Sequence, residues 1–246
     1  MTNELLVLSG EDILFDLGNV VIHQPRLKEI AFLGEEMFFT GCEFLRFSKD
    51  NLGDEDKIHL ENYSNFEVLM SMMKENNITI KQHKNCLLGV LSLVFPNYKI
   101  SLRQFEIVLT QEGIDQEFII NKDNFEAFKD IIETIFCLKS QEEDINPSGE
   151  MAKRIADKLK KRKQRLSEVS KDKKVAILSR YVSILAAGQA KDINQLMNYT
   201  VFQLFDEFKR YQQKMGYDIY MSARMAGASD LEEPDDWMQD NHPEVQ

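Results

Sequence analysis

A long amphipathic segment near the C-terminal end constrains the fold of this chain more than any other feature. Between Val201 and Tyr220 the apolar residues recur at spacings of three and four, the period of one face of an α-helix. Thr200 is a suitable N-cap, and Gly216 is a position where the helix could bend or end. The pattern predicts helix over residues 192–226. The apolar face comprises Val201, Leu204, Phe205, Phe208, Tyr211, Met215, Ile219 and Tyr220.

The sequence before this segment divides into a mixed half and a helical half. Strand-like alternation occurs in residues 4–23, around a Gly18-Asn19 turn, and in residues 99–120, around Glu112-Gly113. Asn121 or Asp123 is expected to cap the next helix. Helical periodicity predicts further helices over residues 26–48, 66–74, 82–95, 149–169 and 174–187. The fold class is therefore mainly α with a minor β component: an α+β N-terminal half and an all-α C-terminal half.

A polar stretch with one proline and one glycine marks the best domain boundary. It occupies residues 141–149, so we predict a linker there. The other predicted parts are an α+β domain over residues 1–140, a helical domain over residues 150–228 and an acidic tail over residues 229–246.

The charge of the chain is negative overall but unevenly distributed. The net charge is −11, which argues against a free-standing nucleic-acid-binding protein. Between Glu150 and Lys174, however, the eleven basic residues outnumber the four acidic ones. On a helix these basic residues would form the solvent-exposed face opposite an apolar stripe, and this is the first interpretation. A contact with acidic residues of this chain or a partner is the second interpretation, and nucleic-acid binding is the third.

Neither a membrane span nor a disulfide framework is indicated. The longest apolar stretch, Cys86 to Phe95, is too short for a span and is interrupted by Gly89 and Ser92. The N-terminus lacks the basic start and apolar core of a secretion signal, so a cytosolic protein is expected. The cysteines are odd in number and far apart, which predicts buried, reduced thiols. They are Cys42, Cys86 and Cys137.

No arrangement typical of catalysis, cofactor binding or metal binding is found in the sequence. The histidines belong to no HExxH or Cys/His cluster, and no phosphate-binding glycine loop is present. Carboxylate pairs such as Asp12/Asp16 are expected by chance in so acidic a chain. A solvated tail is favoured over a metal site at His242. We therefore expect no enzyme activity, no cofactor and no metal. The histidines are His23, His59, His83 and His242.

The amphipathic C-terminal segment has two interpretations. An apolar stripe at helical spacing is most often core, and this is the simpler interpretation. A stripe so rich in aromatic residues, followed by small residues and an acidic tail, also suits recognition of another protein. On the second interpretation the predicted protein-binding residues are Phe202, Phe205, Phe208, Tyr211, Tyr217, Tyr220, Ala226, Gly227 and Trp237.

The same residues resemble a known family. The motif Tyr199-Thr-Val-Phe-Gln-Leu-Phe-Asp-x-Phe-x-Arg, then Tyr217-Asp, Ala226-Gly-Ala and Trp237, is similar to the C-terminal region of tail-morphogenesis proteins of phages that infect Gram-positive bacteria. Many of these are described as tail assembly chaperones. Upstream, the Asn146-Pro147 pair, the basic helix and Ile177 to Ala187 occur in similar order. The N-terminal half shares only the layout of strands followed by Pro25-Arg-Leu-Lys-Glu-Ile.

This resemblance implies a function in assembly rather than catalysis. The expected protein is a tail assembly factor that binds a long helical, tape-measure-like tail protein during morphogenesis in the host cytoplasm. The alternative is a structural component of the tail or baseplate that is retained in the virion. Neither implies nucleic-acid or membrane binding, and self-association into a homo-oligomer stays open.

Overall fold

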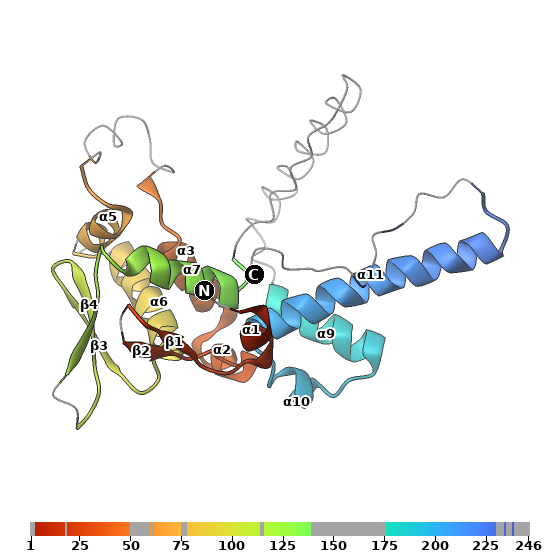
Figure 1. Cartoon of the computed structure of the whole chain (residues 1–246), viewed down its shortest axis with the longest axis horizontal. Helices are drawn as coiled ribbons and strands as arrows, with labels where there is room; N and C mark the ends of the chain where they lie inside the picture. The colour runs from red at the N-terminus through yellow and green to blue at the C-terminus, as the bar shows by residue number, and fades with distance from the viewer. Residues whose placement is uncertain are drawn as a thin grey trace, which may run out of the picture.

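The computed structural model shows an N-terminal body from which one long helix extends (Figure 1). It describes residues 3–17, 19–49, 60, 62–74, 78–113, 116–138, 176–229, 234 and 238. The predicted linker at residues 141–149, the basic helix and Trp237 lie outside the described residues. The predicted fold class is confirmed, since two small antiparallel sheets and the helices around them make up the N-terminal half and only helices follow.

The N-terminal end forms a short helix and a hairpin. Helix α1 (Glu4–Ser9) begins where the Asn3 side chain accepts a hydrogen bond from the Leu5 amide, at 2.9 Å. This helix was not expected. Strands β1 (Ile13–Phe15) and β2 (Val20–Ile22) then pair antiparallel, with alternate residues facing the core, which confirms the predicted hairpin.

The region predicted as one bent helix contains two. Helix α2 (Leu27–Leu33) ends at Gly34, whose φ of 92° only glycine adopts without strain, and α3 (Glu35–Leu45) begins directly after it. Helix α3 crosses α6 (Ile78–Val94) at close range. A Cβ at Gly41 would lie 2.5 Å from the carbonyl oxygen of Cys86, so only glycine permits this approach.

Two other helices of the body follow the prediction closely. Helix α5 (Asn65–Met72) is capped by Ser64, as expected. Helix α6 ends before Pro96, also as expected, but begins four residues earlier than predicted.

The thiols of Cys42 on α3 and Cys86 on α6 are buried and free, whereas Cys137 is only half-buried. Burial raises the pKa of the Cys42 thiol, which keeps it protonated.

The second sheet has three strands, where the sequence predicted two. Strands β3 (Lys99–Arg103), β4 (Glu106–Thr110) and β5 (Glu117–Ile120) pair antiparallel in that order. The predicted single strand from residue 99 is split, because Arg103 pairs with Glu106 across a two-residue turn. The apolar alternation shifts at this turn from Ile100 and Leu102 to Phe105, Ile107 and Leu109, a change of phase that the prediction did not use.

Helix α7 (Phe125–Ile135) supplies aromatic side chains to the core of the body. Its N-cap is Asn124, not Asn121 or Asp123 as predicted. The reason is that Asn121 and Asn124 instead close the turn, where the Asn124 side chain accepts from the Asn121 amide at 2.8 Å. The Phe128 ring stacks on Phe95 with centroids 5.7 Å apart.

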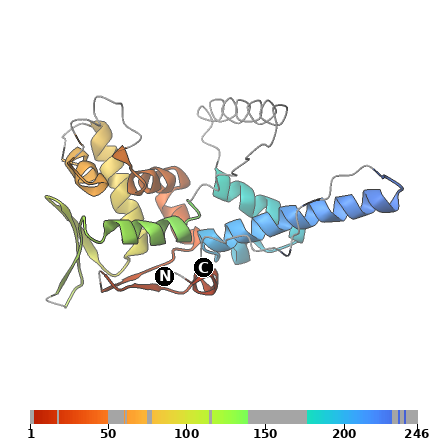
Figure 2. The ribbon, with the colours of Figure 1, turned by 45° about the horizontal axis from the view of Figure 1, so that its top comes forward.

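The C-terminal helices pack onto this body and share its core. Helix α9 (Ile177–Gln189) lies beside the first half of α11 (Val201–Met225), and the short α10 (Ile193–Leu196) connects them (Figures 1 and 2). One apolar cluster contains residues from both halves of the chain. The predicted domain boundaries stay a prediction. No helix in the part of the chain that the structure describes is long and apolar enough to cross a membrane.

Candidate protein-binding surface

Helix α11 begins at a complete capping box. The Thr200 hydroxyl accepts a hydrogen bond from the Gln203 amide at 3.2 Å, and the Gln203 side chain accepts one from the Thr200 amide at 2.9 Å. This confirms Thr200 as the N-cap. The predicted break at Gly216 is absent, since α11 continues as one helix to Met225. One interior glycine costs a helix only about 1 kcal/mol, which the surrounding turns tolerate.

The first part of α11, residues 201–211, is packed into the molecule and is called the core half here. Val201 and Leu204 are fully buried, and Phe202 and Phe208 are only 1% and 8% exposed. The sequence left open whether this stripe is core or surface, and for these residues it is core. Phe202 and Phe208 are therefore unavailable to a partner and are left out of the surface proposed below.

Helix α9 covers the outer side of the core half. The Tyr181 ring stacks on Phe208 at a centroid distance of 3.7 Å and meets the edge of Phe205 at 5.2 Å. Gly188, the residue before the last one of α9, lies against Tyr211: a Cβ at Gly188 would be 2.0 Å from the tyrosine oxygen. Phe205 and Tyr211 are thus half-buried against α9, and neither presents a whole ring to solvent.

The second part of α11, residues 212–225, extends past the end of α9 and is called the projecting half here (Figures 1 and 2). Its apolar side chains are exposed: Ile219 by 64%, Met225 by 85% and Tyr217 by 39%. Met215 and Ile219 continue the stripe that is buried in the core half. Tyr217, Met221 and Met225, at spacings of four, form a second row.

The polar side chains of the projecting half bind one another along the helix. Lys214 and Asp218 form an i,i+4 ion pair at 2.7 Å. Arg224 donates a hydrogen bond to the Tyr220 hydroxyl at 3.0 Å and lies over the Tyr220 ring. These pairs stabilise the helix locally by a few tenths of a kcal/mol each and leave the apolar rows uncovered.

The predicted small-residue segment ends the helix. Ala226 is the C-cap, and Gly227 has a φ of 96° and donates its amide to the Arg224 carbonyl at 3.0 Å. Both residues are exposed. The glycine is required by this backbone conformation, so its presence needs no partner to explain it.

An open pocket of about 440 Å³ lies beside the core half, and its charges are arranged in pairs. Lys191 near its rim forms an ion pair with Glu207 and donates to the Tyr199 hydroxyl at 3.0 Å. Partial burial opposes the charge of Lys191, but these contacts outweigh it and raise its pKa. A lysine that stays charged is a poor nucleophile. The pocket is lined by Leu8, Gln189, Tyr199, Gln203, Asp206, Glu207, Arg210, Tyr211 and Lys214.

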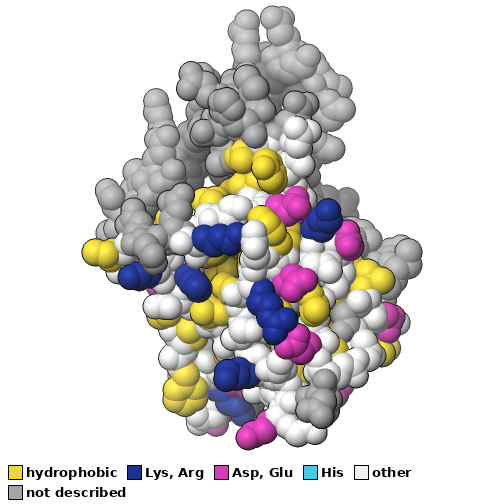
Figure 3. Space-filling model, turned by 90° about the vertical axis from the view of Figure 1, so that its left-hand side faces the viewer, with side chains coloured by type: hydrophobic (Ala, Val, Ile, Leu, Met, Phe, Trp, Pro, Cys, Tyr) yellow, Lys and Arg dark blue, Asp and Glu magenta, His cyan; other side chains and the backbone are white. Residues whose placement is uncertain are grey.

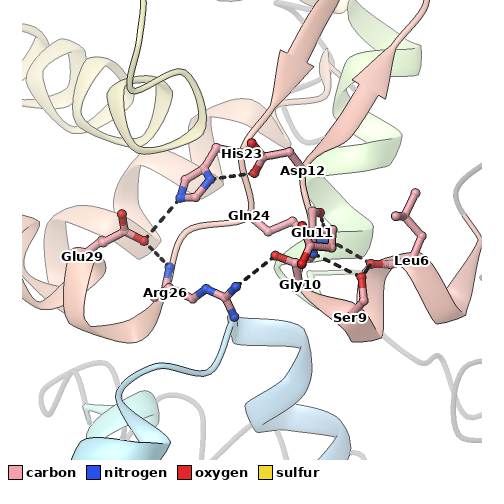
Figure 4. Close-up of polar contacts among 9 residues, drawn as sticks. All are labelled: Leu6, Ser9, Gly10, Glu11, Asp12, His23, Gln24, Arg26 and Glu29. Atoms are coloured by element: carbon pink, nitrogen blue, oxygen red, sulfur yellow. Dashed lines mark hydrogen bonds and ion pairs between the residues drawn. The ribbon is translucent and has the colours of Figure 1, made fainter.

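A polar network beside the start of α11 fixes the body around it (Figure 4). His23 lies between Asp12, at 2.8 Å, and Glu29, at 3.4 Å. Glu29 also accepts from the Arg26 amide at 2.6 Å. The Arg26 guanidinium then donates to the Gly10 carbonyl and to the carbonyl of Asn198. No sequence motif predicted a role for His23, because its partners Asp12 and Glu29 belong to other segments of the fold.

The start of α9 is held in a similar way by a carboxylate from another helix. Glu35, at the first turn of α3, accepts a hydrogen bond from the Leu178 amide at 2.6 Å and one from the Ser179 hydroxyl at 3.1 Å. This contact spans more than 140 residues and has no signal in the sequence. Together with the network at Arg26, it anchors α9 and the core half of α11 to the body.

The described residues offer little to a metal. Within them, no group of three or more His, Cys, Asp and Glu side chains is placed to hold an ion. The remaining predicted residue, Trp237, lies outside the described residues. The distinctive feature of the region is therefore the exposed apolar side chains of the projecting half.

Comparison with known proteins found a match that covers the region of α11. Residues 170–242 match the family model described as the YomV second domain. Neither a curated protein nor a solved structure matches the chain significantly. The matched segment includes α9, α10 and α11, so the anchored part and the projecting half of α11 fall in one family unit. This part of the chain is similar to the YomV second domain.

Proposed function

We propose that this chain is a non-enzymatic phage tail assembly factor that binds a helical segment of a long tail protein. The binding surface is the projecting half of α11, centred on Met215, Tyr217, Ile219, Met221 and Met225. One observation carries the proposal: these apolar side chains are exposed on a helix that is anchored at its other end. The resemblance of the Tyr199 motif to tail-morphogenesis proteins supports the phage assignment.

The physical argument begins with the stability of the projecting half. An isolated helix of this length is marginal in water, because nucleation is costly and each turn adds little. The core half supplies the nucleus here, so the projecting half is a preformed helix. A partner then binds without the full entropy cost of ordering this segment.

The two exposed rows suit a helical partner. Side chains at spacings of three and four form ridges, and ridges of one helix pack into the grooves of another. Each apolar side chain that the partner covers contributes about 25 cal/mol per Å² of surface removed from water. Three of the five central residues are methionines, whose polarisable side chains adapt their shape, which suits a partner with a repeated and variable helical sequence.

The surface chemistry also fits a factor that holds an aggregation-prone partner. The chain carries a net charge of −11, and a strongly charged surface opposes association between complexes. The partner is expected to be an amphipathic helical segment of a tape-measure-like protein.

The test is co-expression of the tagged chain with the long helical tail protein of the same phage. In Ile219→Asp plus Met225→Asp, we expect at least a tenfold loss of captured tail protein, because two charges enter the centre of the interface. Phe32→Asp is the matched control, because Phe32 is 93% exposed on the body. This variant also replaces an exposed apolar side chain by a carboxylate, but leaves α11 unchanged.

Three outcomes would count against the proposal. They are full capture by the α11 variant, equal loss in the Phe32 variant, and a lowered melting temperature of the α11 variant. Mass spectrometry of purified virions adds a further test, since stoichiometric presence would favour a structural tail or baseplate component over a transient factor.

A further inference from the structure

A second pocket differs from the first because the charged side chains described in its lining are all basic. It has a volume of about 330 Å³ and lies between the end of α5, the start of α6 and the β3–β4 turn. Figure 3 looks onto the left-hand side of the molecule as drawn in Figure 1, where Lys and Arg side chains lie among hydrophobic and acidic ones. The apolar lining is Met70, Met73, Ile80 and Leu102, and the polar lining is Lys74, Lys81, Lys84, Arg103 and Gln104.

Neighbouring contacts hold two of the four cations in place. Glu117 accepts two hydrogen bonds from the Arg103 guanidinium, at 2.6 and 2.8 Å, and these bonds raise the pKa of Arg103. The Lys74 ammonium lies 4.4 Å from the centre of the Phe105 ring. Among the residues that the structure describes, those that line the pocket include no carboxylate. In a chain of net charge −11, four cations around an apolar floor form a local site for an acidic ligand.

The chain contains a segment with the complementary chemistry. Residues 229–246 include seven acidic residues and no lysine or arginine. Leu231, Trp237 and Met238 interrupt the acidic run and can fill an apolar floor. We propose that the pocket binds this acidic tail from a second copy of the chain, with carboxylates on the lysines and an apolar side chain against Met70 and Met73.

A second copy is favoured over the same molecule because of where the tail starts. Helix α11 ends at Met225, at the opposite end of the long axis from the sheet that borders the pocket (Figure 1). A head-to-tail contact between two different surfaces of identical copies does not close on itself, so it generates open chains whose length depends on concentration. This inference is independent of the partner proposed for the projecting half.

The test uses charge reversal in the full chain and sedimentation velocity over a concentration series. We expect the average mass of the wild type to rise above 28.6 kDa with concentration. Lys81→Glu plus Lys84→Glu in the pocket, or Asp235→Lys plus Asp236→Lys in the tail, should each keep the mass near that of one chain. Mixing the two variants should restore association, because the reversed pocket then meets a reversed tail.

A labelled synthetic peptide of residues 229–246 gives the matching binding measurement. Its affinity for the wild type should exceed that for the pocket variant by at least tenfold, and added salt should weaken it. A peptide with Trp237→Ala should also bind more weakly. A mass that stays at one chain for the wild type, association that the reversals leave unchanged, or mixing without rescue would overturn the proposal. So would peptide binding that is equal for both proteins.

Discussion

The two halves of α11 have similar amphipathic sequences but different surroundings. In the core half, Leu204 and Phe208 are buried under α9 and the body. In the projecting half, Met215 and Ile219 continue the same stripe and are exposed. The difference arises because α9 ends at Gln189, close to the level of Tyr211. An apolar stripe therefore predicts which face of a helix can bind another element. The length of the neighbouring helix determines which part of that face is buried.

The anchoring of the two halves also differs. The core half is fixed through the capping box at Thr200 and through Gln203, whose side chain donates to the Leu8 carbonyl at 2.7 Å. The polar contacts described above for the projecting half lie within α11 itself. The molecule thus presents an apolar helix on a rigid base, and two substitutions with matched controls test this division.

The largest expected effect comes from truncating a ring in the core half. Phe202→Ala should lower the free energy of unfolding by about 3–5 kcal/mol, because it leaves a cavity in a fully packed site. The matched substitution in the projecting half, Ile219→Ala, should change it by less than about 0.5 kcal/mol. Urea denaturation measures both. Equal losses would show that the projecting half is packed as tightly as the core half.

A smaller effect is expected where α9 meets α11. Gly188→Ala should cost about 1–3 kcal/mol, because its Cβ would overlap the Tyr211 side chain. The loss should shrink in a Tyr211→Ala background. Gly216→Ala is the control in the projecting half, where nothing lies within 4 Å, and it should stabilise the helix by about 0.5–1 kcal/mol. Thermal melts should show a lower melting temperature for Gly188→Ala and a higher one for Gly216→Ala. A lower melting temperature for Gly216→Ala would indicate that residue 216 is packed against another part of the chain.

The smallest effect distinguishes two capping boxes by pH. Hydrogen bonds from the Ser64 amide and hydroxyl lower the pKa of Glu67 in the cap of α5. A lowered pKa stabilises the fold above the unfolded pKa of 4.5, and this contribution disappears as pH falls through the folded pKa. Glu67→Gln should therefore destabilise the chain at neutral pH and lose its effect in acid.

The cap of α11 provides the comparison, because Gln203 does not titrate. Thr200→Ala should cost about 1 kcal/mol at pH 7. The difference from the wild type should be the same at pH 4. A pH-dependent loss for Thr200→Ala, or a pH-independent one for Glu67→Gln, would contradict this assignment of the two caps.

Local signals in the sequence predicted much of the secondary structure. Ser64 and Thr200 carry the side chains that cap helices, and Pro96 ends one, so the starts of α5 and α11 and the end of α6 were identified. The single helix predicted over residues 192–226 is divided into α10 and α11. The turn at Gln104-Phe105 was missed because neither residue is a typical turn former. Gly216 was given as a possible break, but it does not interrupt α11, because the cost of one glycine is small beside the rest of the helix.

The candidate surface could be predicted only in part. The sequence identified α11 as amphipathic, but which residues are exposed depends on contacts between distant segments. Glu35 fixes the start of α9, and Gly188 lets α9 approach Tyr211. Neither contact leaves a periodic pattern. Of the predicted protein-binding residues, Tyr217, Ala226 and Gly227 are exposed, whereas Phe202 and Phe208 belong to the core.

Hydrogen–deuterium exchange along α11 tests the central claim most directly, measured with and without the long helical tail protein. In the isolated chain, we expect slow exchange in the core half and fast exchange in the projecting half. Binding should protect residues 212–225 and leave residues 201–211 unchanged. Strong protection of the projecting half in the isolated chain, or binding that protects a different surface, would contradict the account.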